Sequence, residues 1–310
     1  MKQIPKKIIT MLFVVFFVCS MPIEKREKKI ALKFGHRGAS FDAPENTLAS
    51  VRKAFELGAD GVEIDVQMTA DKKVVVLHDD TLKRTATYTH DLKEKTGMSR
   101  EMFEKIVNTP ICQLNYDEFK YIDVGLWKGK VWSKERVPTL DEVLRIVFFA
   151  KKPGKKVQIE IKGKNLAIIP ELKKILFRYP KSTFAASVML IGFDFETMEV
   201  AKKEIADCCV LLLRELKQIP MLNDVKKSID EMVTAGLDGL GFEANQKLVS
   251  QEIVERVHQK SKIIGVWVYP EQDTWENLEY FQKLGVDFIT TNLPPQAVKG
   301  RISVPLNSGM

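Results

Sequence analysis

The stretch GVEIDV, at residues 61–66, decides how the rest of the chain is interpreted. Successive side chains of an extended strand point to opposite faces, so Glu63 and Asp65 share one face and the aliphatic residues share the other. The aliphatic face suits contact with covering helices. Two carboxylates on the inner face are costly to bury unless they are paired or bound to a metal ion. The stretch therefore predicts a core strand with an acidic inner face.

Strand-like and helix-like segments alternate along the chain from residue 31 onward. Core strands are expected near residues 31–35, 61–68, 157–161, 183–190, 208–213, 237–242, 263–269 and 287–291, and helices near 46–57, 166–178, 195–204, 222–235, 249–260 and 273–284. Asn46 is expected to be the N-cap of the first helix. This alternation predicts parallel strands joined by helices, and about eight units close a (β/α)8 TIM-type barrel, an α/β fold. An open doubly wound sheet is the alternative, but no G-x-G-x-x-G segment follows the first strand.

Residues from about 80 to 140 interrupt this alternation. The segment is largely polar, one helix is expected in it, and it is too long for an ordinary connection between a strand and a helix. We therefore expect an insertion between the second and third barrel strands that lies over one face of the barrel. A further short strand at 73–77 precedes it.

The N-terminal segment has the features of a targeting signal. Lys2, Lys6 and Lys7 precede an apolar run at residues 8–18, and small residues follow at 18–20. We expect residues 1–20 to be a signal peptide or anchor, 21–30 a polar linker and 31–305 the barrel domain. Export to the periplasm or outside the cell follows, with membrane anchoring through residues 8–21 as the alternative. A lipoprotein signal is the third alternative.

Composition restricts the class of ligand. The 310 residues carry a formal net charge of +7, with many lysines near the N-terminus. A basic surface is usually only solvated, although it also attracts anionic small molecules or membranes. There is no zinc-knuckle spacing, no basic helix with heptads and no basic stripe interleaved with aromatics, so we expect no nucleic-acid partner.

Two of the four histidines follow predicted strands. His36 comes directly after the strand at 31–35, within Gly-His-Arg-Gly, and His78 comes directly after the strand at 73–77. Active-site residues of barrel enzymes lie at the carboxyl ends of the strands. A lone histidine is usually structural, but two at strand ends beside charged residues favour a catalytic role.

A third acid strengthens the metal hypothesis. In VQIEIK, at residues 157–162, Glu160 and Lys162 share one face. Three carboxylates with only oxygen donors suit a hard cation such as Mg²⁺ or Ca²⁺, whereas zinc would use histidine or cysteine. The alternative is that the acids form ion pairs with Arg37 or Lys162.

The ordered set of motifs resembles the signature of the glycerophosphodiester phosphodiesterase (GDPD) family. It comprises Gly35-His36-Arg37-Gly38, Pro44-Glu45-Asn46-Thr47, Glu63-Ile64-Asp65, Leu77-His78-Asp79, residues 137–142 (VPTLDE), Glu160-Ile161-Lys162, Val266-Trp267 and residues 289–292 (ITTN). Each tetrapeptide alone is weak evidence. The order and spacing, from about residue 31 to 300, make the resemblance specific.

The resemblance implies a role for each matching residue. The expected catalytic pair is His36 and His78, and the expected metal ligands are Glu63, Asp65 and Glu160. The expected substrate-binding residues are Arg37 and Lys162 for phosphate, Glu45 as a support close to the site, and Phe193 and Trp267 on the pocket wall. Family members commonly carry Ser-Phe where this chain has Gly192-Phe193, so one hydroxyl is absent.

The resemblance also implies a reaction, which is the hydrolysis of glycerophosphodiesters to sn-glycerol 3-phosphate and an alcohol with one divalent cation, Ca²⁺ or Mg²⁺. One histidine would accept a proton from the nucleophile, either the glycerol 2-hydroxyl or water, and the other would protonate the leaving alcohol. A phospholipase D-like enzyme acting on lysophospholipids or sphingolipids is an alternative with the same fold. A non-catalytic phosphodiester-binding protein is disfavoured because no histidine or acid of the set is missing.

Overall fold

Eight parallel strands close into a barrel in the computed structural model, which describes residues 30–216 and 221–293. The barrel strands are β1 (Leu32–Gly35), β2 (Gly61–Met68), β4 (Lys156–Ile161), β5 (Val188–Gly192), β6 (Cys209–Arg214), β7 (Gly239–Glu243), β8 (Ile263–Trp267) and β9 (Phe288–Thr291). The barrel closes because β1 pairs with both β9 and β2. The predicted (β/α)8 fold is confirmed. β3 (Val74–Val76) pairs antiparallel with β2 and lies outside the ring of eight.

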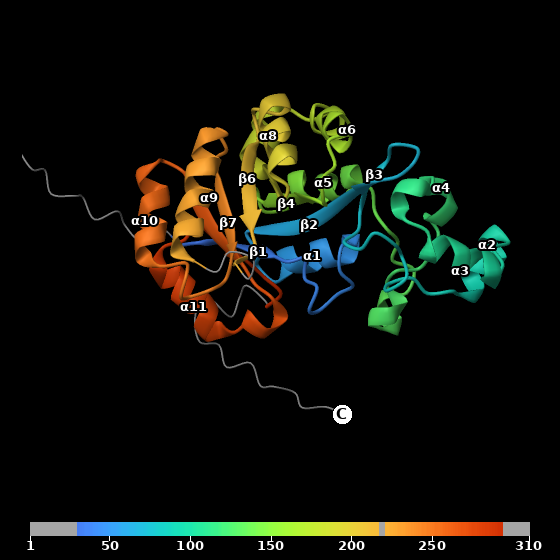
Figure 1. Cartoon of the computed structure of the whole chain (residues 1–310). Helices are drawn as coiled ribbons and strands as arrows, with labels where there is room; N and C mark the ends of the chain where they lie inside the picture. Colours follow the sequence, from blue (N-terminus) through green and yellow to red (C-terminus); the bar gives the residue numbers. More distant parts are fainter. Residues whose placement is uncertain (1–29, 217–220, 294–310) are drawn as a thin grey trace, which may run out of the picture.

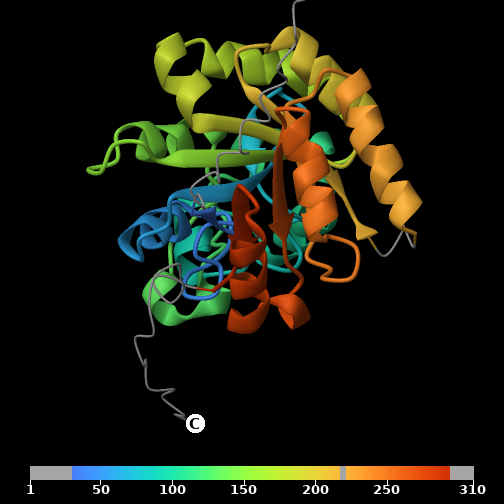
Figure 2. The same ribbon diagram turned by 90° about the vertical axis from the view of Figure 1, so that its left-hand side faces the viewer.

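Helices surround the barrel (Figures 1 and 2). They are α1 (Leu48–Glu56), α5 (Leu140–Phe148), α6 (Ile168–Leu176), α7 (Lys181–Ser187), α8 (Phe195–Glu204), α9 (Leu222–Thr234), α10 (Gln251–Gln259) and α11 (Trp275–Leu284). Their apolar stripes pack on the outward-facing aliphatic residues of the strands, including Val62, Ile64 and Val66, which are fully buried. Burial of this layer is the main stabilising contribution to the barrel.

The barrel interior is filled with large apolar residues over part of its height. Phe34, Leu211 and Phe288 belong to one buried interior cluster, in which the rings of Phe34 and Phe288 meet edge to face. Gly265 faces Phe288, and a Cβ atom there would lie 2.3 Å from the ring, so only glycine leaves room for it. The interior is therefore a packed core, and the strand ends remain available for polar side chains.

The strand register brings the predicted acids together. Glu63 on β2 lies beside Gln158 on β4, and Asp65 lies beside Glu160. Side chains on directly paired residues point to the same side of a sheet. The acidic face predicted from the alternation at residues 61–66 is thus continued by the neighbouring strand.

The insertion after β3 is more structured than the sequence suggested. It contains α2 (His90–Thr96), α3 (Arg100–Asn108) and α4 (Tyr116–Phe119), with short 3-10 turns at Ile111–Gln113, Leu126–Lys128 and Lys130–Trp132. It also has its own buried cluster, which includes Leu92, Phe103 and Phe119. The expectation of a polar segment with one helix was wrong, because the apolar residues are divided among short helices. Figure 1 shows α2, α3 and α4 together on one side of the barrel.

Two local predictions require correction. Residues 183–187, expected to begin a strand, form the end of α7, and β5 begins only at Val188. Pro180 directly precedes this helix, where the missing N–H of proline costs no helical hydrogen bond. The helix buries Phe184. The other correction concerns the start of α1, where Thr47 rather than Asn46 is the N-cap. Asn46 has a positive φ of 57° and turns toward the barrel.

The predicted signal segment and most of the linker (residues 1–29) lie outside the described residues, as do residues 294–305 of the predicted barrel domain. Within the part of the chain that the structure describes, no helix is both long and apolar enough to cross a membrane.

Candidate active site

A cavity of about 490 Å³ opens at the carboxyl ends of the barrel strands. Nine of the ten site residues expected from the sequence line it, namely His36, Arg37, Glu45, Glu63, His78, Glu160, Lys162, Phe193 and Trp267. The tenth, Asp65, is 1% exposed and lies against the lining residues Arg37 and Lys162. The structure therefore brings the whole expected set to one place.

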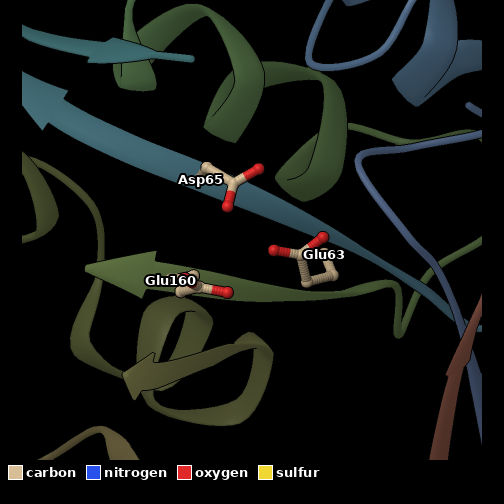
Figure 3. A group of neighbouring side chains, drawn as sticks. All are labelled: Glu63, Asp65 and Glu160. Carbon is tan, nitrogen blue, oxygen red and sulfur yellow. The ribbon is translucent and has the colours of Figure 1, made fainter. Parts of the chain in front are cut away.

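The acidic trio of Glu63, Asp65 and Glu160 occupies neighbouring strands (Figure 3). One carboxylate oxygen from each lies within 4.8 Å of the others. The Oε1 atom of Glu63 is buried and has no hydrogen-bond partner among the described residues. A buried, unpartnered carboxylate oxygen is costly, and converging carboxylates are the ligands that Mg²⁺ and Ca²⁺ prefer. The residues present therefore fit a divalent cation.

Electrostatic strain within the trio also favours a cation. Burial, followed by the charges of Asp65 and Glu160, raises the pKa of Glu63 well above its usual value. Burial and the charge of Asp65 raise the pKa of Glu160 to about 7. Burial also opposes ionisation of Asp65, but Lys162 and Arg37 outweigh it and lower the pKa of Asp65. The raised pKa values mean that Glu63 and Glu160 bind protons more readily than free carboxyl groups do, and a cation would compete with those protons.

Two basic side chains border the trio. Lys162 Nζ donates to Glu160 Oε1 at 2.7 Å and lies 3.4 Å from Asp65 Oδ1. Arg37 Nη1 donates to Glu45 Oε1 at 2.9 Å, and its Nε lies 3.6 Å from Asp65 Oδ2. The ion pairs expected as the alternative to a metal site are thus partly formed. They do not reach Glu63 Oε1, so they do not replace a cation there.

His36 is held by the barrel itself. Its Nδ1 lies 2.8 Å from Asn292 Oδ1, which also accepts from Ser40. The amide of Asn292 donates to Asp273 Oδ2 at 2.9 Å, which fixes its oxygen toward the ring. Nδ1 of His36 is therefore the protonated nitrogen, and Nε2, 3.9 Å from Glu63 Oε2, is left for substrate. Burial, followed by the charge of Arg37, lowers the pKa of His36.

His78 is held from outside the ring of eight strands. It lies two residues beyond β3, which pairs antiparallel with β2 outside the barrel, so its strand-end position is not at the end of a barrel strand. Its Nδ1 lies 2.7 Å from Asp79 Oδ1, and because a carboxylate only accepts, Nδ1 donates. The amide of Gln67 donates to the backbone carbonyls of residues 77–79 and fixes this turn.

Aromatic side chains form the opposite wall of the cavity. Trp267 meets Phe193 edge to face at 5.6 Å between ring centroids, and it meets Tyr269 in the same way at 5.1 Å. Leu213 and Phe288 continue this wall into the barrel. Trp127 and Lys128 reach the cavity from the insertion, and Lys128 Nζ donates to the Ser40 carbonyl oxygen at 2.9 Å. The cavity is therefore charged on one side and apolar on the other.

Sequence reasoning missed the residues that support this arrangement. Asn46 was interpreted as a helix cap, but it donates to Asp65 Oδ2 at 2.8 Å and accepts from the Asp65 backbone N–H. Asn292 and Asp79 stood within quoted motifs without an assigned role. Asp273 and Arg84 gave no signal, because Asp273 is 19 positions from Asn292 and Arg84 is 39 positions from Glu45.

The closed eight-stranded barrel, with a polar cavity at the carboxyl ends of its strands, places the chain among the (β/α)8-barrel enzymes. The profile of the glycerophosphoryl diester phosphodiesterase family matches residues 36–295. The glycerophosphodiester phosphodiesterase of Caldanaerobacter subterraneus subsp. tengcongensis is 30% identical over 268 residues, which cover 85% of this chain and 94% of that protein. That of Bacillus altitudinis is 26% identical, covering 86% of this chain and 97% of that protein.

Solved structures share the fold. A phosphodiesterase of Oleispira antarctica, in complex with the product sn-glycerol-3-phosphate, has a TM-score of 0.69 at 21% identity and covers 87% of this chain and 96% of its own. The glycerophosphodiester phosphodiesterase of Agrobacterium tumefaciens str. C58 has a TM-score of 0.66 at 21% identity, covering 87% and 100%. The chain belongs to the glycerophosphoryl diester phosphodiesterase family, and it is an enzyme of that kind.

Proposed function

We propose that this chain hydrolyses glycerophosphodiesters to sn-glycerol 3-phosphate and an alcohol, with a divalent cation and with His36 and His78 as the proton-exchanging pair. The observation that carries the proposal is the convergence of the acidic trio, both histidines and two basic side chains around one cavity. The product held by the Oleispira antarctica relative supports the same substrate class.

The charged side of the cavity suits the phosphate. Glu63, Asp65 and Glu160 would hold Mg²⁺ or Ca²⁺, whose chemistry here is to neutralise charge on a non-bridging phosphate oxygen. The guanidinium of Arg37 presents a planar fork to the same phosphate, while Glu45 fixes one of its edges. Lys162 adds a point charge whose position is set by Glu160.

The two imidazoles exchange the protons. Both Nδ1 atoms donate to protein acceptors, which leaves both Nε2 atoms for substrate. One Nε2, unprotonated, takes the proton of the nucleophile as the new P–O bond forms. The other ring enters the reaction as an imidazolium, and its Nε2–H protonates the leaving alcohol as the old P–O bond breaks. If the glycerol 2-hydroxyl attacks, a cyclic phosphate forms and water opens it in a second displacement. If water attacks, sn-glycerol 3-phosphate forms directly.

The aromatic side of the cavity gives a reason to test a second substrate class. Phe193, Trp267 and Tyr269 offer an apolar surface to the part of the substrate that carries no phosphate. Glycerol carbons fit such a wall, and so does the acyl-glycerol of a lysophospholipid. Hydrolysis of glycerophosphocholine and of lysophosphatidylcholine, compared under the same conditions, distinguishes a glycerophosphodiester phosphodiesterase from a phospholipase D-like enzyme.

The test is a panel of glycerophosphodiesters assayed with Mg²⁺ and with Ca²⁺, scored for release of sn-glycerol 3-phosphate. We expect release from several headgroups with one or both ions. Failure of every diester to react with either ion contradicts the proposal. Detection of a cyclic glycerophosphate during the reaction assigns the glycerol 2-hydroxyl as nucleophile, and direct incorporation of solvent ¹⁸O without that species assigns water.

We also propose that the chain is exported and that residues 1–20 are its signal peptide or anchor. Three lysines before the apolar run at residues 8–18 support this. Fractionation of producing cells and determination of the mature N-terminus test it. A protein found in the cytoplasm with residues 1–20 intact contradicts export, and one retained in the membrane fraction with these residues intact favours the anchor.

A further inference from the structure

Arg84 makes an unusual set of contacts for a half-exposed arginine. It lies in the turn that leads from His78 into the insertion. Its Nε donates to Asp79 Oδ2 at 2.7 Å and its Nη2 to Asp79 Oδ1 at 3.0 Å. Its Nη1 and Nη2 also donate to the two oxygens of Glu45, each at 2.7 Å. One planar guanidinium therefore holds two carboxylates, each through both of its oxygens.

Each of these carboxylates also holds a residue of the proposed machinery. Asp79 Oδ1 accepts from His78 Nδ1 at 2.7 Å, and Glu45 Oε1 accepts from Arg37 Nη1 at 2.9 Å. A continuous chain of hydrogen bonds thus runs from His78 through Asp79, Arg84 and Glu45 to Arg37. Arg84 stands at its centre.

This chain connects two segments that no strand pairing joins. Glu45 belongs to the connection between β1 and α1, whereas Asp79 and Arg84 follow β3 at the entry to the insertion. The insertion has its own apolar cluster, separate from the layer that holds α1 on the barrel. Strand pairing through β2 and the amide of Gln67 place the turn that carries His78, and the contacts of Arg84 add a direct side-chain link from this turn to Glu45.

The exposure of Arg84 shows what kind of contribution to expect from it. Its side chain is 43% exposed, and ion pairs at such positions contribute little to global stability because water and salt screen them. Four fork-like hydrogen bonds nevertheless restrict orientation strongly. A small displacement of a catalytic group can cost far more in rate than in stability.

We propose that Arg84 is a positioning residue for phosphodiester hydrolysis. It holds the His78 imidazole and the Arg37 guanidinium at positions from which both reach the same phosphate. The proposal rests on the proposed function above, because it assumes that both groups act on the same substrate. Arg84 itself does not line the cavity, so it acts through Asp79 and Glu45.

The test compares R84A, R84K and a matched control, R136Q, with wild type, using glycerophosphocholine and saturating Mg²⁺ or Ca²⁺. Arg136 also lies in the insertion and pairs with Asp123 and Asp91, but it does not line the cavity and touches none of the proposed machinery. We expect R84A to lose roughly 10- to 100-fold in kcat with a smaller change in KM, as is typical when a supporting residue is removed. R136Q should keep the wild-type kcat even if its Tm falls.

Two further measurements separate positioning from a general structural role. A lysine offers one ammonium in place of a fork, so R84K should stay well below wild type. Because the position is half exposed, added guanidinium ion at concentrations far below those that unfold proteins should restore part of the kcat of R84A. Ammonium ion should restore none of it.

The outcomes are distinguishable. An active wild type with R84A at the wild-type kcat overturns the inference and leaves the proposed function standing. A loss in R84A that R136Q matches, and that guanidinium does not relieve, also overturns it, because the effect is then structural. A wild type that releases no sn-glycerol 3-phosphate from any diester overturns the proposed function and this inference together.

Discussion

The two histidines of this enzyme are held by different regions of the molecule and by different chemistry. His36 follows a barrel strand, and its ring is fixed by the neutral amide of Asn292. His78 follows β3, which pairs antiparallel with β2 outside the barrel. Its ring is fixed by the carboxylate of Asp79, which in turn accepts from Arg84. We call His36 with Asn292 and Asp273 the barrel arm, and His78 with Asp79 and Arg84 the insertion arm. A neutral amide fixes the ring in the barrel arm, whereas more exposed charged groups fix it in the insertion arm.

The difference shows that two regions of the molecule, the barrel and the turn after β3, contribute to one candidate active site. The barrel supplies the acidic trio and one imidazole at positions that the strand register fixes. The other imidazole comes from the turn after β3, at the entry to the insertion. The Leu77 N–H and the Gln67 amide tie the backbone of this turn to β2, and the side chain of Asp79 orients the ring. Changes to the insertion arm should therefore affect rate with little loss of global stability, whereas changes to the barrel acids affect both.

Removal of the cation should have the largest effect, because in the proposed mechanism both histidines act on a phosphate that the cation on the acidic trio binds. We expect excess EDTA to abolish turnover and added Mg²⁺ or Ca²⁺ to restore it. The activating ion should also raise the Tm of wild type and not of E63Q, since Glu63 provides an otherwise unpartnered oxygen. Full turnover in excess EDTA would remove the cation from the mechanism.

Removal of either imidazole should cost the next largest amount. H36A and H78A should each lose about 10²–10⁴-fold in kcat/KM, the usual contribution of a general acid or base. H90A is the matched control, because His90 lies on the insertion with its side chain 81% exposed and paired with Glu94. Near-normal turnover in H36A or H78A, with the protein folded, would exclude that residue from proton exchange.

A substrate with a better leaving group sharpens the comparison of the two arms. Replacement of the alcohol by a nitrophenol lessens the need for a general acid, so the variant that lacks the acid should recover relative to wild type. Recovery of H78A alone assigns the acid to the insertion arm, and recovery of H36A alone assigns it to the barrel arm. Equal losses of both variants on both substrates would contradict a division of roles.

Loss of the support behind His36 should have a smaller effect. D273A removes the acceptor that orients the Asn292 amide, so the imidazole loses a fixed partner while remaining in place. We expect kcat to fall by roughly 10- to 100-fold, as for other supporting residues. Steady-state kinetics beside far-UV circular dichroism measure this. An unchanged kcat would show that Asn292 needs no second anchor.

The smallest expected effect is a pH dependence of stability in the insertion arm. Burial opposes ionisation of Asp79, but its hydrogen bonds from Arg84 and His78 lower the pKa of Asp79 to about 2. A lowered pKa means stability that is present above the unfolded-state value near 4 and is lost as the pH falls toward 2. The difference in urea midpoint between wild type and D79N should therefore shrink between about pH 5 and pH 3. A difference that stays constant over this range would contradict the assignment.

Glu160 on the barrel should show the opposite sign when no cation is bound. The pKa of Glu160 is raised to about 7, so the folded state holds its proton more tightly than the unfolded state. Its burial then costs stability as the pH rises from about 4.5 to 7. Bound cation should relieve this loss, so its stabilising effect should grow over that range. Urea titrations with and without the ion measure it.

The sequence predicted the convergence of the acidic trio well, because that convergence depends on local rules. Side chains two residues apart on a strand share a face, which placed Glu63 with Asp65 and Glu160 with Lys162. Neighbouring parallel strands then brought Asp65 beside Glu160. The alternation of strands and helices likewise predicted the barrel, although α7 showed that a short helix can replace the start of an expected strand.

The supporting residues could not be predicted in this way. Arg84 and Glu45 are 39 positions apart, and His36 and Asn292 are 256 apart, so only the folded chain brings them together. Asn46 has the residue type of a helix cap, and nothing local indicates that it turns toward Asp65 instead. The insertion gave a weak signal because its apolar residues are spread over short helices.

The most direct test is the release of sn-glycerol 3-phosphate from glycerophosphocholine by wild type, H36A, H78A and E63Q, each with excess Mg²⁺ or Ca²⁺. If barrel and insertion act on one phosphate, wild type turns over and all three folded variants lose most of that activity. A folded wild type that releases no product from any diester, or an H78A variant that matches wild type, would contradict the joint site.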